Sequence, residues 1–358
     1  MDAFQRSTGA AVGGSPAGAA SLGLVGIQET DDPCHWERVS QPWEVLAMPL
    51  TAGPFGNRKT FLATAHWILY HESFSSRLRV RALSPAGMLA VSVPVQLGSR
   101  SSYFNRSLQQ GGMPAMLPGC AEAVLDADQQ HFMLLIRLTL LRRLLPAEQA
   151  ETLEAAAAGR WLAASPTVIE RLGRWLKEVL ARTHRAPEML RHSAAVETLE
   201  RELVQGLVGT LRLTTGPAPP ERRSLRQRGF DRAIECIRYA DLTTLDLAAL
   251  CTIAGVSQRT LEYAFREHLG LSPAAFIRQL RLHALRRELL ASRLGEASVT
   301  DVAYHLGFTQ LGRLSGDYRR TFGELPSRTL ARTLTDDVPP FWIDGIGSQS
   351  RADVRAYG

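Results

Sequence analysis

The sequence predicts an α+β, multidomain chain with three folded parts. These are a β-rich sandwich or barrel-like module over residues 36–139, a helical middle over 140–213, and an all-α C-terminal domain over 230–334. In the last domain, a linker helix is expected to join two helix-turn-helix motifs. Three observations carry this prediction: short β-favouring runs broken by Gly, Pro and Ser, a later change to helical periodicity, and a pattern that occurs twice near the C-terminus.

Length and composition allow such an arrangement. The chain has 358 residues, of which 45% are hydrophobic and 21% are charged, which is the composition of ordinary folded domains and enough length for two or three of them. There is no run of about 18 apolar residues, so no membrane span is expected. Residues 1–35 begin with a Gly/Ala/Ser-rich stretch that has neither a basic segment nor a continuous apolar run. They are expected to form a flexible tail rather than a secretory signal.

Several classes of site lack their sequence signatures. The scattered cysteines form no CxxC pair, which argues against a disulfide framework or a structural zinc site and suits the cytoplasm. GxGxxG, GxxxxGK[ST] and GxSxG motifs do not occur, so the nucleotide-binding and hydrolase patterns are missing. No metal and no cofactor are expected.

The N-terminal module is predicted from short runs with β-favouring residues. They are WEVLAMPL, TFLATAHWILY, RLRVRAL, MLAVSVPVQL and HFMLLIRL, and turn-forming segments such as TAGPFGN and SPAG separate them. Many short strands with frequent turns favour a sandwich or a barrel. Aromatic and histidine residues in these runs either line a pocket or, as we favour, pack in the core, and none is a site candidate: Trp43, His66, Trp67, Tyr70, His71 and Tyr103.

The middle region has helical periodicity. Ser165 and Pro166 suit a cap and a first helical position, and a second helix is expected around 188–213. Both helices carry an apolar stripe that serves either intramolecular packing or a dimer seam. Residues 214–229 are Pro/Gly-rich and then basic, as in a linker, and residues 335–358 are expected to be a tail.

Positive charge is concentrated in the C-terminal part. Residues 221–334 contain 18 arginines and 12 acidic residues, a net charge of +6, and the whole chain has only two lysines, Lys59 and Lys177. The guanidinium group presents a fixed fork of donors that matches phosphate groups and guanine edges. This distribution favours a nucleic-acid partner for the last domain.

A repeat within this basic region supports the same conclusion. In the first copy, Cys251, Gly255, Leu261, Phe265 and Gly270 occur in order, and Pro273 follows. The second copy has the same residue types at the same offsets, with one extra residue after the turn glycine: Ala303, Gly307, Leu314, Tyr318, Gly323 and Pro326. A small residue permits close helix crossing, a glycine permits the left-handed turn, and the aliphatic–aromatic pair packs inward. Two copies about 52 residues apart are much more specific than one, and a plain helical bundle is the weaker interpretation.

Residues 230–330 resemble the DNA-binding domain of the AraC/XylS family of transcription regulators. The resemblance is carried by LAALCTIAGVSQRTLEYAFREHLGLSPAAFIRQLRLHALRRELL and VTDVAYHLGFTQLGRLSGDYRRTFGELPSRTL. The segment GFTQLGRLSGDYRRTFGELPS is similar to a subgroup that includes the ethanolamine-utilisation regulator. The resemblance implies a double-stranded operator or promoter as partner, an N-terminal module for a small-molecule effector or for homodimer formation, and contact with RNA polymerase.

The resemblance also implies which residues read DNA. On the first recognition helix, Leu261 and Phe265 face inward, and the base-facing positions carry Gln258, Arg259, Glu262 and Tyr263. On the second, Gln310 and Arg313 are the candidates for base contact, because the outward positions include Gly312 and Gly316. Phosphate contacts are expected from the remaining arginines and from residues at helix N-termini: Ser257, Arg266, Thr309, Arg319, Arg320 and Ser327. Ser257 and Thr309 are expected to cap the two helices, and Arg278 and Arg281 on the linker helix are left as either structural or backbone-contacting.

The sequence thus predicts a cytoplasmic transcription regulator, an activator, that is controlled through its N-terminal module and is not an enzyme. One alternative is a constitutive architectural DNA-binding protein without an effector. Another is a β-barrel enzyme with a DNA-binding tail, which would need clustered ligands or a nucleophile with its base.

Overall fold

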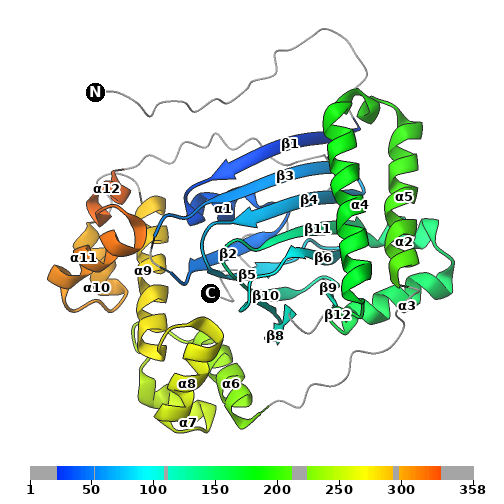
Figure 1. Ribbon diagram of the computed structural model, residues 1–358. Helices are drawn as coiled ribbons and strands as arrows, with labels where there is room; N and C mark the ends of the chain where they lie inside the picture. Colours follow the sequence, from blue (N-terminus) through cyan, green and yellow to red (C-terminus); the bar gives the residue numbers. More distant parts are fainter. Residues whose placement is uncertain (1–21, 52, 109–111, 212–223, 293–297, 332–358) are drawn as a thin grey trace.

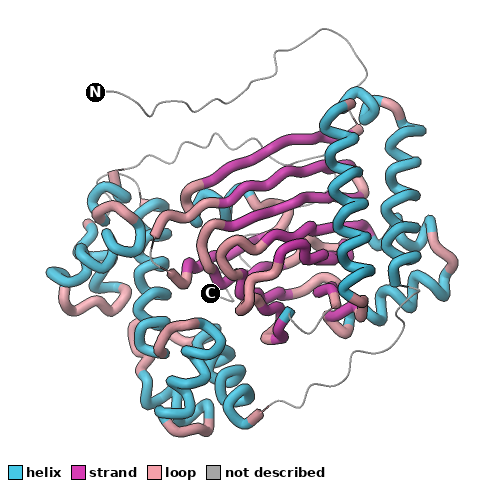
Figure 2. Tube along the Cα trace, in the orientation of Figure 1, coloured by secondary structure: helices cyan, strands magenta, loops and turns pink. Residues whose placement is uncertain are grey.

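The computed structural model describes residues 22–51, 53–108, 112–211, 224–292 and 298–331. Two β-sheets form the centre of the molecule, α4 and α5 run along one side of them, and the helical C-terminal part lies against the opposite side (Figures 1 and 2). The predicted α+β architecture is therefore confirmed. The N-terminal module is a two-sheet sandwich, and the C-terminal domain is helical.

The strands form two antiparallel sheets. One has seven strands in the order β1-β3-β4-β11-β6-β9-β12, and the other has five in the order β2-β5-β10-β7-β8. Their bounds are β1 Gly23–Thr30, β2 Glu44–Pro49, β3 Asn57–Thr64, β4 Trp67–Phe74, β5 Leu78–Leu83, β6 Met88–Gln96, β7 Ser102–Tyr103, β8 Arg106–Ser107, β9 Met113–Met116, β10 Cys120–Leu125, β11 Gln130–Arg137 and β12 Trp161–Leu162.

Alternation along the strands of the larger sheet gives it two buried faces. In β4, Trp67 and Leu69 belong to the core under the helices, whereas Ile68, Tyr70 and Phe74 face the second sheet. Successive strand residues point to opposite faces, and both faces are covered here. This explains why the runs in the sequence are almost continuously apolar.

The helices of the middle region cover the outer face of the larger sheet. Their bounds are α2 Leu138–Leu144, α3 Ala147–Ala158, α4 Pro166–Arg185, the short 3-10 helix η2 Pro187–Arg191 and α5 Ser193–Leu211. Ser165 caps α4 as predicted, because its side chain accepts a hydrogen bond from the Val168 amide. The apolar stripes of α4 and α5 are buried against the sheet, with Leu176 and Leu207 fully inaccessible. These stripes therefore serve intramolecular packing.

The structure departs from the expected tail over residues 1–35. Residues 1–21 lie outside the described part, but β1 and the helix α1 (Pro33–Val39) begin within the predicted tail. β1 pairs along its whole length with β3, from Gly23 opposite Thr64 to Thr30 opposite Asn57. An isolated edge strand with glycine has little local signal, and pairing with β3 determines its structure.

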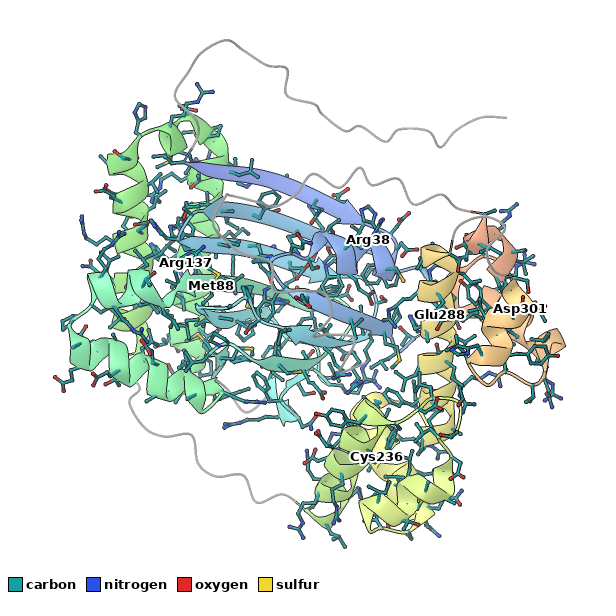
Figure 3. The ribbon with its side chains drawn as sticks, turned by 180° about the vertical axis from the view of Figure 1, so that it is seen from behind. Arg38, Met88, Arg137, Cys236, Glu288 and Asp301 are labelled. Carbon is teal, nitrogen blue, oxygen red and sulfur yellow. The ribbon has the colours of Figure 1, made fainter. Side chains whose placement is uncertain are left out.

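The C-terminal domain has seven described helices, and the other six pack on the longest of them. They are α6 Leu225–Tyr239, α7 Leu247–Ala254, α8 Gln258–Leu269, α9 Pro273–Ala291, α10 Val299–His305, α11 Leu311–Phe322 and α12 Pro326–Leu330. The first three pack with the N-terminal half of α9, and the last three pack with its C-terminal half, in two separate cores. Seen from behind, Cys236 on α6 and Asp301 on α10 lie toward opposite ends of α9 (Figure 3). Since α6 starts at Leu225, the linker expected over 214–229 is wrong for its last residues, and 212–223 lie outside the described part.

The turns of both helix-turn-helix motifs have the predicted form, with one exception. Gly255 and Gly307 adopt φ of 62° and 78°, in the left-handed region where a side chain is unfavourable. Ser257 caps α8 by accepting from the Thr260 amide. Thr309 does not cap α11, because that helix starts one residue later and its N-cap is Gln310, whose side chain makes no capping bond.

Candidate functional site

One face of α8 carries the polar side chains that the sequence assigned to DNA. Leu261, Phe265 and Leu269 are buried on the opposite face, as expected. Gln258, Arg259, Tyr263 and Arg266 are exposed, and Glu262 is half-buried. Tyr263 is 47% exposed, so this face of α8 presents an aromatic side chain beside its polar ones.

These side chains support one another along the helix. The Arg259 guanidinium lies 5.6 Å from the Tyr263 ring centre and donates to its hydroxyl at 3.4 Å. Gln258 donates to Glu262 at 3.2 Å, and Arg266 lies 4.0 Å from the same carboxylate. Residues four apart share a helix face, so α8 presents one pair and an adjoining group of three interacting side chains rather than separate charges.

The corresponding face of α11 is short of side chains. Leu314 and Tyr318 are buried, whereas Gln310 and Arg313 are exposed. A Cβ atom added at Gly312 or Gly316 would meet nothing within 4 Å. The fold therefore does not require glycine at either position.

The remaining candidates for phosphate contact are exposed at the helix ends. Ser257, Thr309 and Ser327 lie at or next to the N-termini of α8, α11 and α12, where amide groups favour an anion. Arg319 and Arg320 are exposed in the last turn of α11. Arg320 is also paired with Asp317 at 2.7 Å, so binding a phosphate there would exchange one partner for another.

The arginines of the linker helix are turned toward the protein. Arg281 donates to the Leu242 carbonyl at 2.6 Å and so holds the loop before α7. Arg278 forms an ion pair with Asp317 of α11. Arg281 therefore has a structural role, whereas the exposed Arg278 keeps both assignments that the sequence left open.

The length of α9 sets the spacing of the two motifs. It has 19 residues, which corresponds to roughly 28 Å at 1.5 Å per residue. Because the two cores occupy different halves of α9, α8 and α11 are held by opposite ends of one rigid rod.

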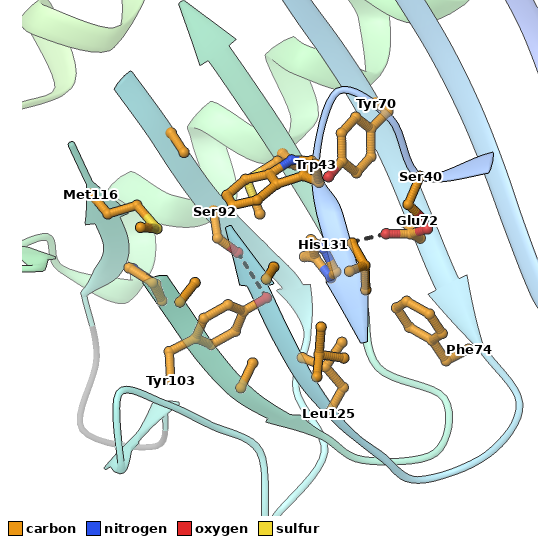
Figure 4. Close-up of a pocket in the computed structure, with 18 of the residues that line it drawn as sticks. Ser40, Trp43, Tyr70, Glu72, Phe74, Ser92, Tyr103, Met116, Leu125 and His131 are labelled. Atoms are coloured by element: carbon orange, nitrogen blue, oxygen red, sulfur yellow. Dashed lines mark hydrogen bonds and ion pairs between the residues drawn. The ribbon is translucent and has the colours of Figure 1, made fainter. Parts of the chain in front are cut away.

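The N-terminal sandwich contains a cavity between its sheets (Figure 4). The space open to the centres of water-sized molecules is about 70 Å³, several times what one water needs. Apolar side chains form most of the wall, and tyrosine, tryptophan and charged residues form one end. The lining includes Trp36, Ser40, Trp43, Lys59, Tyr70, Glu72, Phe74, Ala90, Ser92, Tyr103 and His131.

Three ionisable side chains form a row across the cavity wall. The strand register places Glu72 of β4 directly opposite both Lys59 of β3 and His131 of β11. Glu72 lies 3.4 Å from Lys59 and 3.9 Å from His131, and all three are at most 3% exposed. Glu72 also accepts from the Trp36 indole at 2.8 Å and from Asn57 at 3.0 Å.

The state of His131 follows from its burial. Desolvation lowers its pKa to about 4, although Glu72 opposes the shift. The imidazole is therefore neutral near pH 7. Its Nδ1 atom has no hydrogen-bond partner within the described residues.

The aromatic residues noted in the sequence divide between cavity and core. Trp43, Tyr70 and Tyr103 line the cavity, whereas Trp67 is fully buried under the helices. His66 is hydrogen-bonded to Glu200 at 2.6 Å. Sequence reasoning missed Trp36, Lys59, Glu72 and His131, and the only available signal was charge at inward positions of apolar strands.

The described residues contain no group of three or more His, Cys, Asp or Glu that could hold a metal ion. Among them, no helix is long and apolar enough to cross a membrane.

The sequence similarity to known proteins lies in the C-terminal part of the chain. Residues 250–332 match the family described as a helix-turn-helix domain. The chain is 33% identical over 134 residues to the XylDLEGF operon transcriptional activator 3 of Pseudomonas putida, covering 37% of this chain and 40% of that protein. It is 36% identical over 106 residues to the regulatory protein HrpB of Ralstonia nicotianae, covering 30% of this chain and 22% of that protein. The chain thus spans less than half of the length of these relatives.

Two solved structures are also similar to parts of the chain. A probable AraC family transcriptional regulator from Rhodopseudomonas palustris is 32% identical, with 28% of this chain and 94% of that chain covered and a TM-score of 0.27. The alignment with the AraC-like transcriptional activator CuxR covers 79% of this chain and 100% of that chain, at 14% identity and a TM-score of 0.37.

Proposed function

We propose that this chain, whose C-terminal domain is a helix-turn-helix domain of the AraC/XylS type, is a sequence-specific transcription regulator that inserts α8 and α11 into successive major-groove faces of an operator. The observation that carries the proposal is the pair of helix-turn-helix units on opposite halves of α9, each with an exposed polar helix face. Activation rather than repression is supported by relatives that are themselves named activators. The regulator would act in the cytoplasm and contact RNA polymerase.

The two helices are proposed to contribute unequally. Arg259, Glu262, Tyr263 and Gln258 on α8 supply hydrogen-bonding groups for base edges, since arginine can bind guanine in a bidentate manner and glutamate can accept from cytosine. On α11, Gln310 and Arg313 are the base-facing candidates. Because Gly312 and Gly316 have no side chains, α11 can approach the duplex closely and recognise the shape of the DNA rather than its base edges.

The phosphate contacts are proposed to position both helices. Arg266, Arg319 and Arg320 are exposed cations beside the two faces, and Ser257, Thr309 and Ser327 lie where helix amides favour an anion. Such contacts fix register without carrying sequence information.

In vitro selection from a random duplex pool, carried out with the full chain, tests the proposal. The selected sites should contain two conserved blocks, and the block that contacts α8 should be the more strongly conserved. Base-by-base substitution in each half-site, measured by titration, then ranks the two helices. Equal affinity for selected and random duplexes would contradict a sequence-specific regulator, and stronger preference in the α11 block would contradict the unequal assignment.

Control through the N-terminal sandwich is the second part of the proposal, either by a small molecule or by association of two chains. The largely apolar cavity favours a small molecule over a purely architectural protein. An enzyme is disfavoured because relatives of the C-terminal domain are regulators. A ligand screen that leaves both melting temperature and operator affinity unchanged would favour the architectural alternative.

A further inference from the structure

Helix α1 lies between the cavity and the linker helix α9. It has only seven residues, Pro33–Val39, and Asp32 caps it by accepting from the amides of Cys34 and His35 at 2.8 and 3.2 Å. Three side chains make contacts outside α1. Trp36 forms part of the cavity wall, and Asp32 and Glu37 contact arginines of α9.

The cavity side of α1 is formed by Trp36. Its indole NH donates to Glu72, and its ring meets the Phe74 ring edge-on at 5.3 Å between centroids. Ser40, which follows the helix, donates to the Trp36 carbonyl at 2.7 Å and also lines the cavity. A molecule that contacts the charged end of the cavity therefore also contacts α1.

The opposite side of α1 is ion-paired to α9. Glu37 accepts from Arg287 at 2.7 and 3.2 Å and also accepts from the Ala47 amide at 2.7 Å. Asp32 forms an ion pair with Arg286, which is 3% exposed at its side chain. Arg286 in turn donates to Glu324, just before α12, at 2.9 Å. The second helix-turn-helix unit is thus connected through Arg286 to the cap of α1.

The charges in the cavity indicate what kind of molecule fits. Lys59 and Glu72 balance each other, and His131 is neutral. An anion would leave an additional negative charge beside Glu72 in a place from which water is largely excluded, which is strongly unfavourable. A molecule without charge keeps the balance, and the Nδ1 atom of His131 offers it one hydrogen-bonding partner.

We propose that the cavity binds a small uncharged, largely apolar molecule with one polar group, and that α1 transmits its occupancy to α9 and hence to both helix-turn-helix units. This inference rests on the proposed function. A bound molecule changes the contacts of Trp36 and Glu72, and α1 is too short to absorb that change internally. The ion pairs of Asp32 and Glu37 then hold α9 differently. A ligand acts by binding the two arrangements with different affinity.

The binding step is tested on the full chain with charge-matched probes. Cyclohexanol and benzyl alcohol are compared with cyclohexanecarboxylate and benzoate, with tryptophan fluorescence and melting temperature as readouts, since Trp36 and Trp43 line the cavity. Each alcohol should bind about tenfold or more tightly than its carboxylate. Ala90→Leu, which fills the cavity from β6, should abolish the response. Binding that survives this substitution, a preference for the carboxylates, or no response to either alcohol up to its solubility limit would overturn the proposal.

The transmission step is tested with Glu37→Gln, which keeps the size of the side chain and removes its charge. Benzyl alcohol should change the operator affinity of the unaltered chain by roughly fivefold or more. In Glu37→Gln, its binding by fluorescence should stay within about twofold, while the change in operator affinity disappears. Glu154→Gln is the matched control, because Glu154 also accepts two hydrogen bonds from one arginine, Arg142, at 2.9 and 2.8 Å, and it lies on α3, away from α1 and α9. A normal response in Glu37→Gln would rule out α1 as the path.

The two proposals fail in different ways. If the full chain selects no operator, the proposed function fails, but the fluorescence titration, which needs no DNA, still decides whether the cavity binds uncharged molecules. If operator binding is specific but no alcohol binds, only the present inference fails.

Discussion

Arg259 and Tyr263 form a pre-arranged pair on the outward face of α8. Stacking over the ring and the hydrogen bond to the hydroxyl limit the rotamers of the Arg259 side chain. A side chain that is already ordered loses less entropy when it binds. This favours Arg259 as the residue that reads a base, compared with an arginine that has no such support.

We expect Arg259→Ala to weaken binding to the selected operator by about 1–3 kcal/mol and to relax preference at one base pair. Arg266→Ala should instead weaken operator and random duplex alike, because a phosphate contact carries no sequence information. Competition titrations with both duplexes measure this difference. Equal losses on the two duplexes for Arg259→Ala would refute direct readout by that residue.

His131 gives the protein a predictable acid sensitivity. Burial lowers its pKa from 6.5 to about 4, so on acidification the unfolded chain takes up a proton before the folded one does. The contribution of His131 to the free energy of unfolding is complete above about pH 6.5 and is lost as the pH falls toward 4. At pH 5 the loss is about 2 kcal/mol. The groups that face the ring are Glu72, Lys59 and His71.

Urea unfolding at pH 7.5 and pH 5 measures this contribution. Burial also lowers the pKa of His71, His268 and His283, so the comparison is with His131→Gln, in which part of the pH dependence should vanish. A variant with the same pH dependence as the unaltered chain would show that His131 does not titrate as expected.

The charged row is also where sequence reasoning stopped. The apolar runs around Lys59 and Glu72 predicted strands, and strands were found. The burial of Lys59, Glu72 and His131 together depends on the pairing of β3 with β4 and of β4 with β11. This pairing places Glu72 opposite both of the other side chains. A sequence pattern gives the face of each residue within its own strand but not its partner in the next one.

At the scale of elements, α11 shows what the repeat could and could not predict. The spacing of glycine, aliphatic and aromatic residues gave both turns and both buried faces correctly. The N-cap at Thr309 was wrong because the extra residue in the second turn moves the start of α11 to Leu311. The outward glycines were visible in the sequence, and the structure adds that nothing in the fold occupies the space beside them.

That open space allows a sharp test of close approach by α11. Gly312→Ala and Gly316→Ala should each stabilise the helix by up to about 1 kcal/mol, and yet weaken operator binding if the duplex backbone passes close to these positions. Melting temperature and operator titration are measured on the same samples. Gly209→Ala on α5, which is also exposed with nothing within 4 Å, should raise stability without changing DNA binding. Unchanged operator affinity in both α11 variants would show that the duplex keeps its distance.

At the scale of the whole molecule, the sandwich and the first helix-turn-helix unit share a core. Met48 and Val124 from the smaller sheet, and Leu50 just after β2, pack with α6, α8 and α9. Arg77 donates to the Leu269 and His268 carbonyls at 2.6 and 2.8 Å, which satisfies the C-terminal end of α8. These contacts couple the stability of the C-terminal domain to that of the sandwich.

We therefore expect a single cooperative thermal transition for the full chain and two transitions for Leu50→Asp. The substitution places a charge in the shared core, and each kcal/mol lost should lower the melting temperature of the helical domain by roughly 5 °C. Calorimetry measures both effects. Leu97→Asp, at a position that is 41% exposed on the same sandwich, should leave the transition single, and a single transition in Leu50→Asp would mean that the shared core contributes little.

The row formed by Lys59, Glu72 and His131 has a consequence for how the sheet is assembled. If β4 paired with β3 one residue out of alignment, Glu72 would turn to the face covered by helices, and Lys59 would be buried without a carboxylate. Such a misaligned sheet would contain two uncompensated charges and would be far less stable than the correct one. The same side chains that line the cavity therefore act as an alignment check during folding, and a substitution chosen to alter ligand preference there also alters how strictly the chain rejects the wrong pairing.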